Sequence, residues 1–332
     1  MDPHKNSPMT SRERFSKTMR FEKPDRVPYF EEGLRREVIR AWRKQGLPRH
    51  ADLARMFPSD GREEIELDLE PRPQPKKWPV SIHELDALQK SLDPQDARRL
   101  PRGWSRRVRA WKTREHTLML RVHRGFFLSM GVHGWDRFLE VLLLLKTDPQ
   151  FVQAALTIQG EFSAGLTRRV LSEVEIDAAI FSEPIGGNDR PLLSPQMYAE
   201  FVLASYRPVL DVLARFGVET IIFRTFANAR PLIPEILEQG FNCLWACEVN
   251  IDAMDYRDLR REFGRDLRLI GGVDLDALRR GKEAIRLEIE KKVPPLLAGG
   301  GYVPLADGRV RADVPFENYI YYRQLLEKVT QA

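Results

Sequence analysis

The sequence predicts an α/β protein that folds as a single (β/α)8 TIM barrel, with helices and a β-hairpin added before the barrel. Two observations predict this class. From residue 177 onward, short apolar runs alternate with helical segments, and repeated β–α units at this spacing indicate a parallel sheet with right-handed crossovers. The chain also has 332 residues, of which 42% are hydrophobic, and this is enough for one large barrel core.

The regular half of the chain supplies most of the predicted barrel. Two helices are predicted first, at 135–145 and 148–173, and the second has a clear start with Asp148 as N-cap and Pro149 in the first turn. The predicted strands that follow are 177–181, 219–223, 242–246, 267–270 and 301–304; the predicted helices are 194–216, 231–239, 255–263, 275–297 and 316–329. No G-x-G-x-x-G follows a strand and no Walker loop appears, so a nucleotide-binding doubly wound sheet is the weaker alternative.

The first part of the chain is less regular. Residues 25–30, 64–69 and 126–130 read as strands, and residues 106–113 and 117–122 alternate like the two arms of a β-hairpin. A first helix is predicted to begin at Ser11, which would be its N-cap. The opening M-D-P-H-K-N-S-P-M-T has no apolar core of a signal peptide. We therefore expect a disordered tail at 1–10 and one domain at 11–332.

Composition argues against several classes of protein. The net charge is +5 and the pI about 9.2, but lysines and arginines are scattered among acids, so we expect no nucleic-acid partner. No apolar run approaches ~20 residues, the length of a membrane-spanning helix. Only two cysteines are present, Cys243 and Cys247, which fits a reducing compartment. These features predict a cytoplasmic protein.

Polar residues follow the predicted strands directly, and in a barrel such residues would meet at one mouth. Glu183, Arg224, Glu248 and Asp274 are the candidate catalytic residues, and Asn228 and Asp307 are candidate substrate contacts. Carboxylates beside an arginine can hold a polar substrate and tune the pKa of one acid. For each residue, helix capping or a surface ion pair is an open alternative. Arg224 is the strongest candidate, because a permanent charge at a buried strand end is costly unless it meets a carboxylate or an anionic ligand.

Metal binding by the cysteines is not expected. Cys243 and Cys247 lie four residues apart on a predicted strand, about 13 Å at the rise of a strand, which is too far for one zinc ion. Among the histidines, His123 is of most interest, because it ends the predicted strand 117–122 beside Arg124. We predict that His123 contacts substrate, with a structural role as the alternative.

Four segments, in this order, resemble those of a known family. They are S-R-E-R-F…K-P-D-R-V-P (11–28), L-L-S-P-Q-M-Y-A-E-F-V…Y-R-P-V (192–209), L-I-G-G-V-D (269–274) and A-G-G-G-Y-V-P-L-A-D-G…D-V-P-F-E-N-Y (298–319). With them the chain resembles the uroporphyrinogen decarboxylase superfamily, which includes the heme-pathway decarboxylase and corrinoid-linked methyltransferases. The resemblance implies one (β/α)8 barrel with its pocket at the carboxyl ends of the strands, and a possible homodimer.

The motifs of the two branches are only partly present. The decarboxylase carries R-Q-A-G-R-Y after its first strand, where this chain has E-E-G-L-R-R-E (31–37), so Arg35 and Arg36 are possible analogues that would bind carboxylates. The methyltransferase branch binds zinc through H-x-C at the strand end that here reads Arg224-Thr225-Phe226. A guanidinium is not a zinc ligand, so the resemblance points to the methyltransferase-like branch without zinc.

Three hypotheses remain open. The first is a zinc-independent methyltransferase or demethylase for a small anionic or ether-type molecule, with a corrinoid (cobalamin) protein as methyl partner and no cofactor held tightly by this chain. Glu183 or Glu248 would protonate the leaving atom and Arg224 would anchor an anionic group. The second is a cofactor-free decarboxylase or lyase of a small carboxylate, and the third is a non-catalytic ligand-binding barrel.

Overall fold

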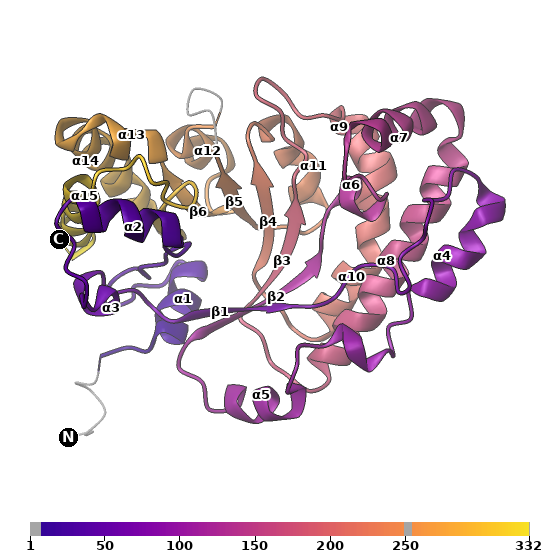
Figure 1. Ribbon diagram of the computed structural model, residues 1–332, viewed down its shortest axis with the longest axis horizontal. Coiled ribbons are helices and arrows are strands. Elements are labelled where there is room, and N and C mark those ends of the chain that lie inside the picture. The colour runs from indigo at the N-terminus through magenta and orange to yellow at the C-terminus, as the bar shows by residue number, and fades with distance from the viewer. Residues whose placement is uncertain (1–7, 249–253, 332) are drawn as a thin grey trace. The chain divides into compact units, whose positions relative to one another are not determined.

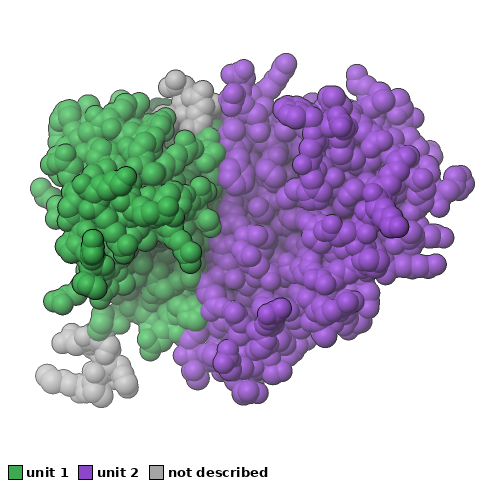
Figure 2. All heavy atoms as spheres, viewed as in Figure 1, with its two compact units in different colours: residues 1–62, 115–117, 243–332 green, residues 63–114, 118–242 purple. Residues whose placement is uncertain are grey.

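The computed structural model describes residues 8–248 and 254–331. The chain forms two compact units, each made of segments that are distant in the sequence (Figure 2). Unit 1 consists of residues 1–62, 115–117 and 243–332, and unit 2 consists of residues 63–114 and 118–242. No helix in the described part of the chain is long and apolar enough to cross a membrane.

Unit 2 contains a parallel sheet with helices packed on it (Figure 1). Its strands are β1 (Arg62–Glu66), β2 (Thr117–His123), β3 (Ala178–Glu183) and β4 (Ile221–Phe226), the first residues of β1 and β2 being counted with unit 1. Its α-helices are α4 (Leu85–Ser91), α5 (Trp104–Trp111), α6 (Phe126–Ser129), α7 (Trp135–Thr147), α8 (Pro149–Leu171), α9 (Pro195–Met197), α10 (Ala204–Arg215) and α11 (Ile233–Glu238). A π-helical segment, Tyr198–Leu203, joins α9 to α10, and 3-10 turns occur at Ile82–Glu84, Ala97–Arg99 and Arg230–Leu232.

Unit 1 contains three parallel strands and their helices. The strands are β5 (Cys243–Cys247), β6 (Arg268–Val273) and β7 (Tyr302–Ala306), each paired with the next along the chain. The helices are α1 (Ser11–Met19), α2 (Arg36–Lys44), α3 (Leu53–Met56), α12 (Tyr256–Phe263), α13 (Leu275–Arg280), α14 (Lys282–Gly299) and α15 (Phe316–Gln331).

The predicted α/β class is confirmed. From β3 onward, strand and helix alternate as the apolar pattern indicated, and this is the architecture of a TIM-barrel-like fold. Asp148 caps α8 by accepting a hydrogen bond from the Phe151 amide at 3.1 Å, with Pro149 at the first helical position. The described residues contain seven strands, one fewer than the eight of the predicted barrel.

The predicted β-hairpin is wrong. Its first arm is helix α5, because Trp104, Val108 and Trp111 recur at helical spacing and the two tryptophan rings meet at 5.5 Å. Its second arm is β2, which pairs in parallel with β3. The alternation of charged and apolar residues in 106–113 was interpreted as a strand. Over so few residues, the same pattern also fits a helix.

Two further predicted strands are absent. Residues 25–30 form no strand, because the Tyr29 amide donates to the Asp60 carboxylate at 2.7 Å instead of to a neighbouring strand. Residues 126–130 form the short helix α6, whose Phe126 amide donates to Glu183. In both places a buried carboxylate accepts a hydrogen bond from a backbone amide that, in a strand, would donate to the neighbouring strand.

The first helix begins one residue earlier than a Ser11 cap would place it. Thr10 is the N-cap, and it forms a capping box with Glu13: the Glu13 amide donates to the Thr10 hydroxyl at 3.2 Å, and the Thr10 amide donates to the Glu13 carboxylate at 2.8 Å. Thr10 is therefore ordered. The rest of the predicted disordered tail lies largely outside the described residues.

Helices α8 and α10 approach each other closely at Gly160, where a Cβ would lie only 2.1 Å from the carbonyl oxygen of Ser205. We expect Gly160→Ala to lower the free energy of unfolding by about 1–3 kcal/mol, because the backbones must move apart. Urea unfolding measures the change. Gly299→Ala, also on a helix, is the control, since its Cβ would meet only ordinary contacts of 3.5 Å or more. Equal loss in both variants would contradict the close approach as the cause.

Candidate functional site

Side chains of the unit 2 sheet divide between two faces. Arg121 is paired in register with Ile180, and Ser182 with Arg224. Because residues in register on parallel strands share a face, Arg121, Ser182 and Arg224 lie on one face, which we call the charged face. After Arg121 the register shifts by one residue, so that His123 is paired with Phe181. This bulge turns His123 to the opposite face, which helix α10 covers.

On the charged face, four residues form an arginine–glutamate cluster: Glu64, Glu66, Arg121 and Arg224. Arg224 Nη1 donates to the two carboxylate oxygens of Glu64 at 2.9 and 3.1 Å. Arg121 Nη2 donates to Glu64 at 3.2 Å and to Glu66 at 3.0 Å. Arg224 is buried, Arg121 is half-buried and Glu66 is exposed. The buried permanent charge of Arg224 thus meets a carboxylate of the chain itself, within a cluster that is open to solvent on one side.

A further arginine follows directly after β2. Arg124 is buried and forms an ion pair with Glu70. Its permanent charge therefore meets a carboxylate of the chain itself, as that of Arg224 does.

The face covered by α10 carries a buried hydrogen-bond network around Glu183. The Tyr206 hydroxyl donates to Glu183 Oε2, the Tyr198 hydroxyl donates to the same oxygen at 3.3 Å, and the Phe126 amide donates to Oε1 at 3.0 Å. Burial raises the pKa of Glu183 to about 7, against the lowering effect of these hydrogen bonds. A carboxyl group that titrates near neutral pH can both accept and donate a proton.

His123 lies beside this network. Its ring centroid is 4.4 Å from that of Tyr206, and its Nδ1 accepts a hydrogen bond from the Gly125 amide at 3.0 Å. Burial, together with the charge of Arg124, lowers the pKa of His123 to about 3. The imidazole is therefore neutral at physiological pH, and its proton is on Nε2.

Glu183 and Arg224 do not share a site in this sheet, which corrects the expectation that the strand-end residues converge. Arg224 is in register with Ser182, and Glu183 is in register with Thr225. Because side chains alternate along a strand, this offset of one residue puts the two predicted catalytic groups on opposite faces.

Asn228 fixes the loop after β4. Its side-chain amide donates to the Asp189 carbonyl at 2.8 Å, and its Oδ1 accepts from the Arg230 amide at 3.1 Å. Both ends of the amide are thus engaged within the loop, as in an Asx turn. The contact with substrate that the sequence predicted for Asn228 stays a prediction.

In unit 1, the predicted acids mostly stabilise local backbone. Asp274 is the N-cap of α13, where it accepts from the Asp276 amide at 2.8 Å and pairs with Arg280 at 2.9 Å. Asp307 accepts from the Leu275 amide at 3.0 Å. The capping alternative therefore describes both residues in this structure.

The other predicted residues of unit 1 are exposed. The Glu248 side chain is exposed and pairs with Arg311 at 3.1 Å. Arg35 is the N-cap residue of α2 and Arg36 is the first residue of that helix, and both are exposed. Their roles in catalysis and in carboxylate binding stay predictions.

Several residues of the two networks escaped the sequence-based prediction: Glu64, Glu66, Arg121, Tyr198 and Tyr206. A signal for three of them was present, since Glu64, Glu66 and Arg121 are charges on one face of two short strands. Tyr198 and Tyr206 carried no such signal, because only the packing of the π-helical segment and α10 beside β3 brings their hydroxyls to Glu183.

The cysteines lie at the two ends of β5, and both are buried. Burial raises the pKa of Cys243 to about 12, so this thiol does not ionise at neutral pH. In residues 8–248 and 254–331, no three His, Cys, Asp or Glu side chains are grouped as a metal would require. The donor set at the end of β4 does not fit zinc, because Arg224 brings a positive charge and no lone pair.

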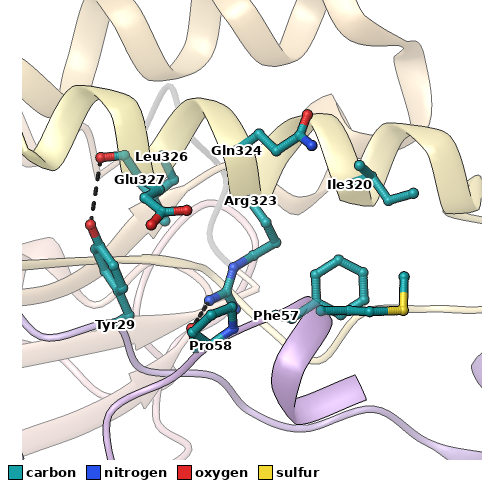
Figure 3. Close-up of a pocket in the computed structure, with 9 residues that line it drawn as sticks. Tyr29, Phe57, Pro58, Ile320, Arg323, Gln324, Leu326 and Glu327 are labelled. Carbon is teal, nitrogen blue, oxygen red and sulfur yellow. Dashed lines mark hydrogen bonds between the residues drawn. The ribbon is translucent and has the colours of Figure 1, made fainter. Parts of the chain in front are cut away.

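Two pockets lie away from these networks. The pocket in Figure 3, of about 170 Å³, is in unit 1 between Tyr29, Phe57 and Pro58 and the α15 residues Ile320, Arg323 and Leu326. Arg323 in its lining donates to Glu31 at 2.5 Å and to the Pro58 carbonyl. A second pocket, of about 450 Å³, lies in unit 2 between residues 73–79 and helix α4. Neither pocket is lined by a predicted site residue.

Comparison with solved structures shows the same fold over nearly the whole chain. A methyltransferase from Methanosarcina mazei is similar with a TM-score of 0.58 and 14% sequence identity, covering 96% of this chain and 99% of that one. Xylanase B from Clostridium stercorarium F9 has a TM-score of 0.41 and 11% identity, covering 78% of this chain and 82% of the xylanase. No curated protein matched the sequence.

The family comparison agrees with the four sequence segments and with the barrel-like fold. The family model described as uroporphyrinogen decarboxylase (URO-D) matches residues 128–319, more than half of the chain. Its match extends from helix α6 to the first turn of α15. The chain therefore belongs to the uroporphyrinogen decarboxylase family.

Proposed function

We propose that this chain is a zinc-independent enzyme of methyl transfer, which moves a methyl group between a small anionic or ether-type molecule and a corrinoid protein. The family supports an enzyme. The likeness to a methyltransferase over 96% of the chain supports methyl transfer as the reaction. The corrinoid belongs to the partner, and it would supply a cobalt atom that accepts the methyl group.

The observation that carries the proposal is the arginine–glutamate cluster. Arg121 and Arg224 both donate to Glu64, so the cluster already has the geometry of two guanidinium groups on one carboxylate. A substrate carboxylate can take the same donors, because charge-assisted hydrogen bonds to arginine are strong and directional. Alternation puts Phe226 on the same face, and it is 38% exposed. Together these groups favour a molecule with an anionic end and an apolar body.

The chemistry assigns separate tasks to the two faces. Methyl transfer breaks the bond between carbon and the leaving oxygen or nitrogen, and the leaving atom then gains a proton. Glu183 is fully buried on the face covered by α10, and it positions the start of α6 by accepting a hydrogen bond from the Phe126 amide. On the charged face, Glu66 is the exposed carboxylate of the cluster, and it would supply the proton to the leaving atom.

The test supplies the purified protein with cob(I)alamin and either 3-methoxybenzoate or glycine betaine, and follows methylcobalamin by its absorbance. We expect product with at least one of these probes. Arg121→Gln and Arg224→Gln should lower kcat/KM about 10- to 100-fold, as expected for loss of a hydrogen bond between charged groups. Arg98→Gln is the matched control, because Arg98 is exposed and pairs with Asp96 outside the cluster.

Two results would replace this function. Release of carbon dioxide from a carboxylate probe, with cobalamin unchanged, would establish the decarboxylase alternative. Saturable binding of 3-methoxybenzoate with no product of either kind would establish the non-catalytic alternative. Separately, zinc at one equivalent in the active protein would contradict the zinc-independent chemistry.

A further inference from the structure

Three arginines of unit 1 surround one aromatic ring. The guanidinium carbons of Arg260, Arg265 and Arg268 lie 5.4, 4.6 and 5.3 Å from the centroid of the Phe21 ring. Arg260 belongs to α12, Arg265 to the turn after it, and Arg268 is the first residue of β6. We call these four residues the Phe21 site. It gathers three positive charges from one stretch of chain around a residue that follows α1.

The hydrogen bonds of these arginines go to backbone carbonyls. Arg265 Nη2 donates to Phe21 O at 3.2 Å and Arg268 Nε donates to Met19 O at 2.9 Å. Arg260 donates to the carbonyls of Gly264 and Gly300. Within the described chain, none of the three forms an ion pair with a carboxylate. Since a guanidinium has five N–H donors, Arg265 and Arg268 keep donors for a further acceptor.

The three charges act on one another. Burial lowers the pKa of Arg260, and the neighbouring charges of Arg265 and Arg268 lower it further. The carbonyls at the end of α1 offset part of this repulsion, because the C-terminal end of a helix carries partial negative charge. A bound anion would offset more of it, since opposite charges a few ångströms apart attract strongly near a protein surface.

The backbone at the Phe21 site is held in an unusual conformation. Phe21 has a φ of 58°, which is rare for a bulky residue, and Gly301 has a φ of 61°. A Cβ on Gly301 would lie 2.4 Å from the Phe21 ring. The Phe21 ring therefore packs directly on Gly301. This contact fixes the position of the ring against which the three arginines lie. Strained backbone of this kind concentrates at functional positions.

From these contacts we propose that Arg265 and Arg268, arranged around Phe21, bind a phosphate group of a small molecule. Phosphate fits better than a single carboxylate because it carries up to two negative charges and has three acceptor oxygens, enough for two arginines at once. Arg268 begins β6, whereas Asp274 directly follows the carboxyl end of that strand. The site is therefore separate from the predicted strand-end residues and independent of the proposed methyl transfer.

The experiment titrates the full-length protein with inorganic phosphate by isothermal calorimetry, with ionic strength held constant with sodium chloride. Glycerol 3-phosphate in a parallel titration distinguishes an ester from free phosphate as the preferred form. We expect saturable binding that Arg265→Gln/Arg268→Gln weakens at least tenfold. Arg261→Gln is the matched control: Arg261 lies on the same helix as Arg260, is exposed and pairs with Asp258, so its loss should leave phosphate binding unchanged.

The competing explanation is that the arginines only hold the end of α1. In that case the wild-type protein would show no phosphate binding above the chloride background, and the proposal would be overturned. Equal weakening in Arg261→Gln would also overturn it, since that result reports general attraction to a basic surface. If the double variant fails to fold, Arg265→Gln alone decides the question, because the exposed Arg265 makes only one of the backbone contacts.

Discussion

Replacing Arg224 with alanine is expected to lower the free energy of unfolding by about 3 kcal/mol. The Arg224 side chain is 10% exposed and its partner Glu64 is 16% exposed. Removing one member of a buried ion pair leaves the other charge desolvated, which typically costs about 3–5 kcal/mol. The lower end applies here, because Arg121 still donates to Glu64 at 3.2 Å.

A double-mutant cycle in urea measures this interaction. Glu64→Ala in the Arg224→Ala background should recover part of the lost stability, because no unpaired carboxylate then remains. Arg98→Ala is the control, and it should cost little because the Arg98 side chain is 71% exposed where it pairs with Asp96. If the double variant is as unstable as the sum of the single variants, Arg224 and Glu64 do not interact as described.

Stability is expected to fall as the pH rises from about 4.5 to 7, through the Glu183 carboxyl group. Its pKa is about 7 in the folded chain, compared with 4.5 for an ordinary glutamate. Below pH 4.5 the group is protonated in both states and costs nothing. Between these values the unfolded chain releases its proton while the folded chain keeps it, so unfolding becomes more favourable. A difference of about 2.5 pH units corresponds to about 3 kcal/mol, which is fully lost above pH 7.

Glu183→Gln tests this effect, since glutamine does not titrate but can still accept from the Phe126 amide. The free energy of unfolding of both proteins is measured between pH 4.5 and 8. The wild-type protein should lose about 3 kcal/mol relative to the variant across this interval. A constant difference between the two curves would falsify the assignment of a raised pKa to Glu183. Tyr206→Phe should enlarge the loss and extend it to higher pH, because the Tyr206 hydroxyl lowers the pKa of Glu183 by stabilising the ionised form.

The sequence was sufficient where the signal is local. Alternation of apolar runs with helices predicted β3 to β7 and the helices between them, because each element must bury one face. Asp148 and Pro149 also predicted the start of α8, because a helix cap acts only on the next three residues and can be recognised locally. Family membership also followed from short segments read in order, and the match over residues 128–319 confirms it.

What only the tertiary structure decided concerns partners and faces. The alternation in 106–113 suited a strand or a helix. In the folded chain it forms helix α5, whose Trp104 and Trp111 side chains donate to the distant residues Glu173 and Glu63. The bulge after Arg121 has no local sequence signature, yet it sends Arg121 to one face and His123 to the other. Register between β3 and β4 then separates Glu183 from Arg224. Sequence therefore determined which polar groups end the strands, while strand register, which depends on long-range pairing, determined which of them meet.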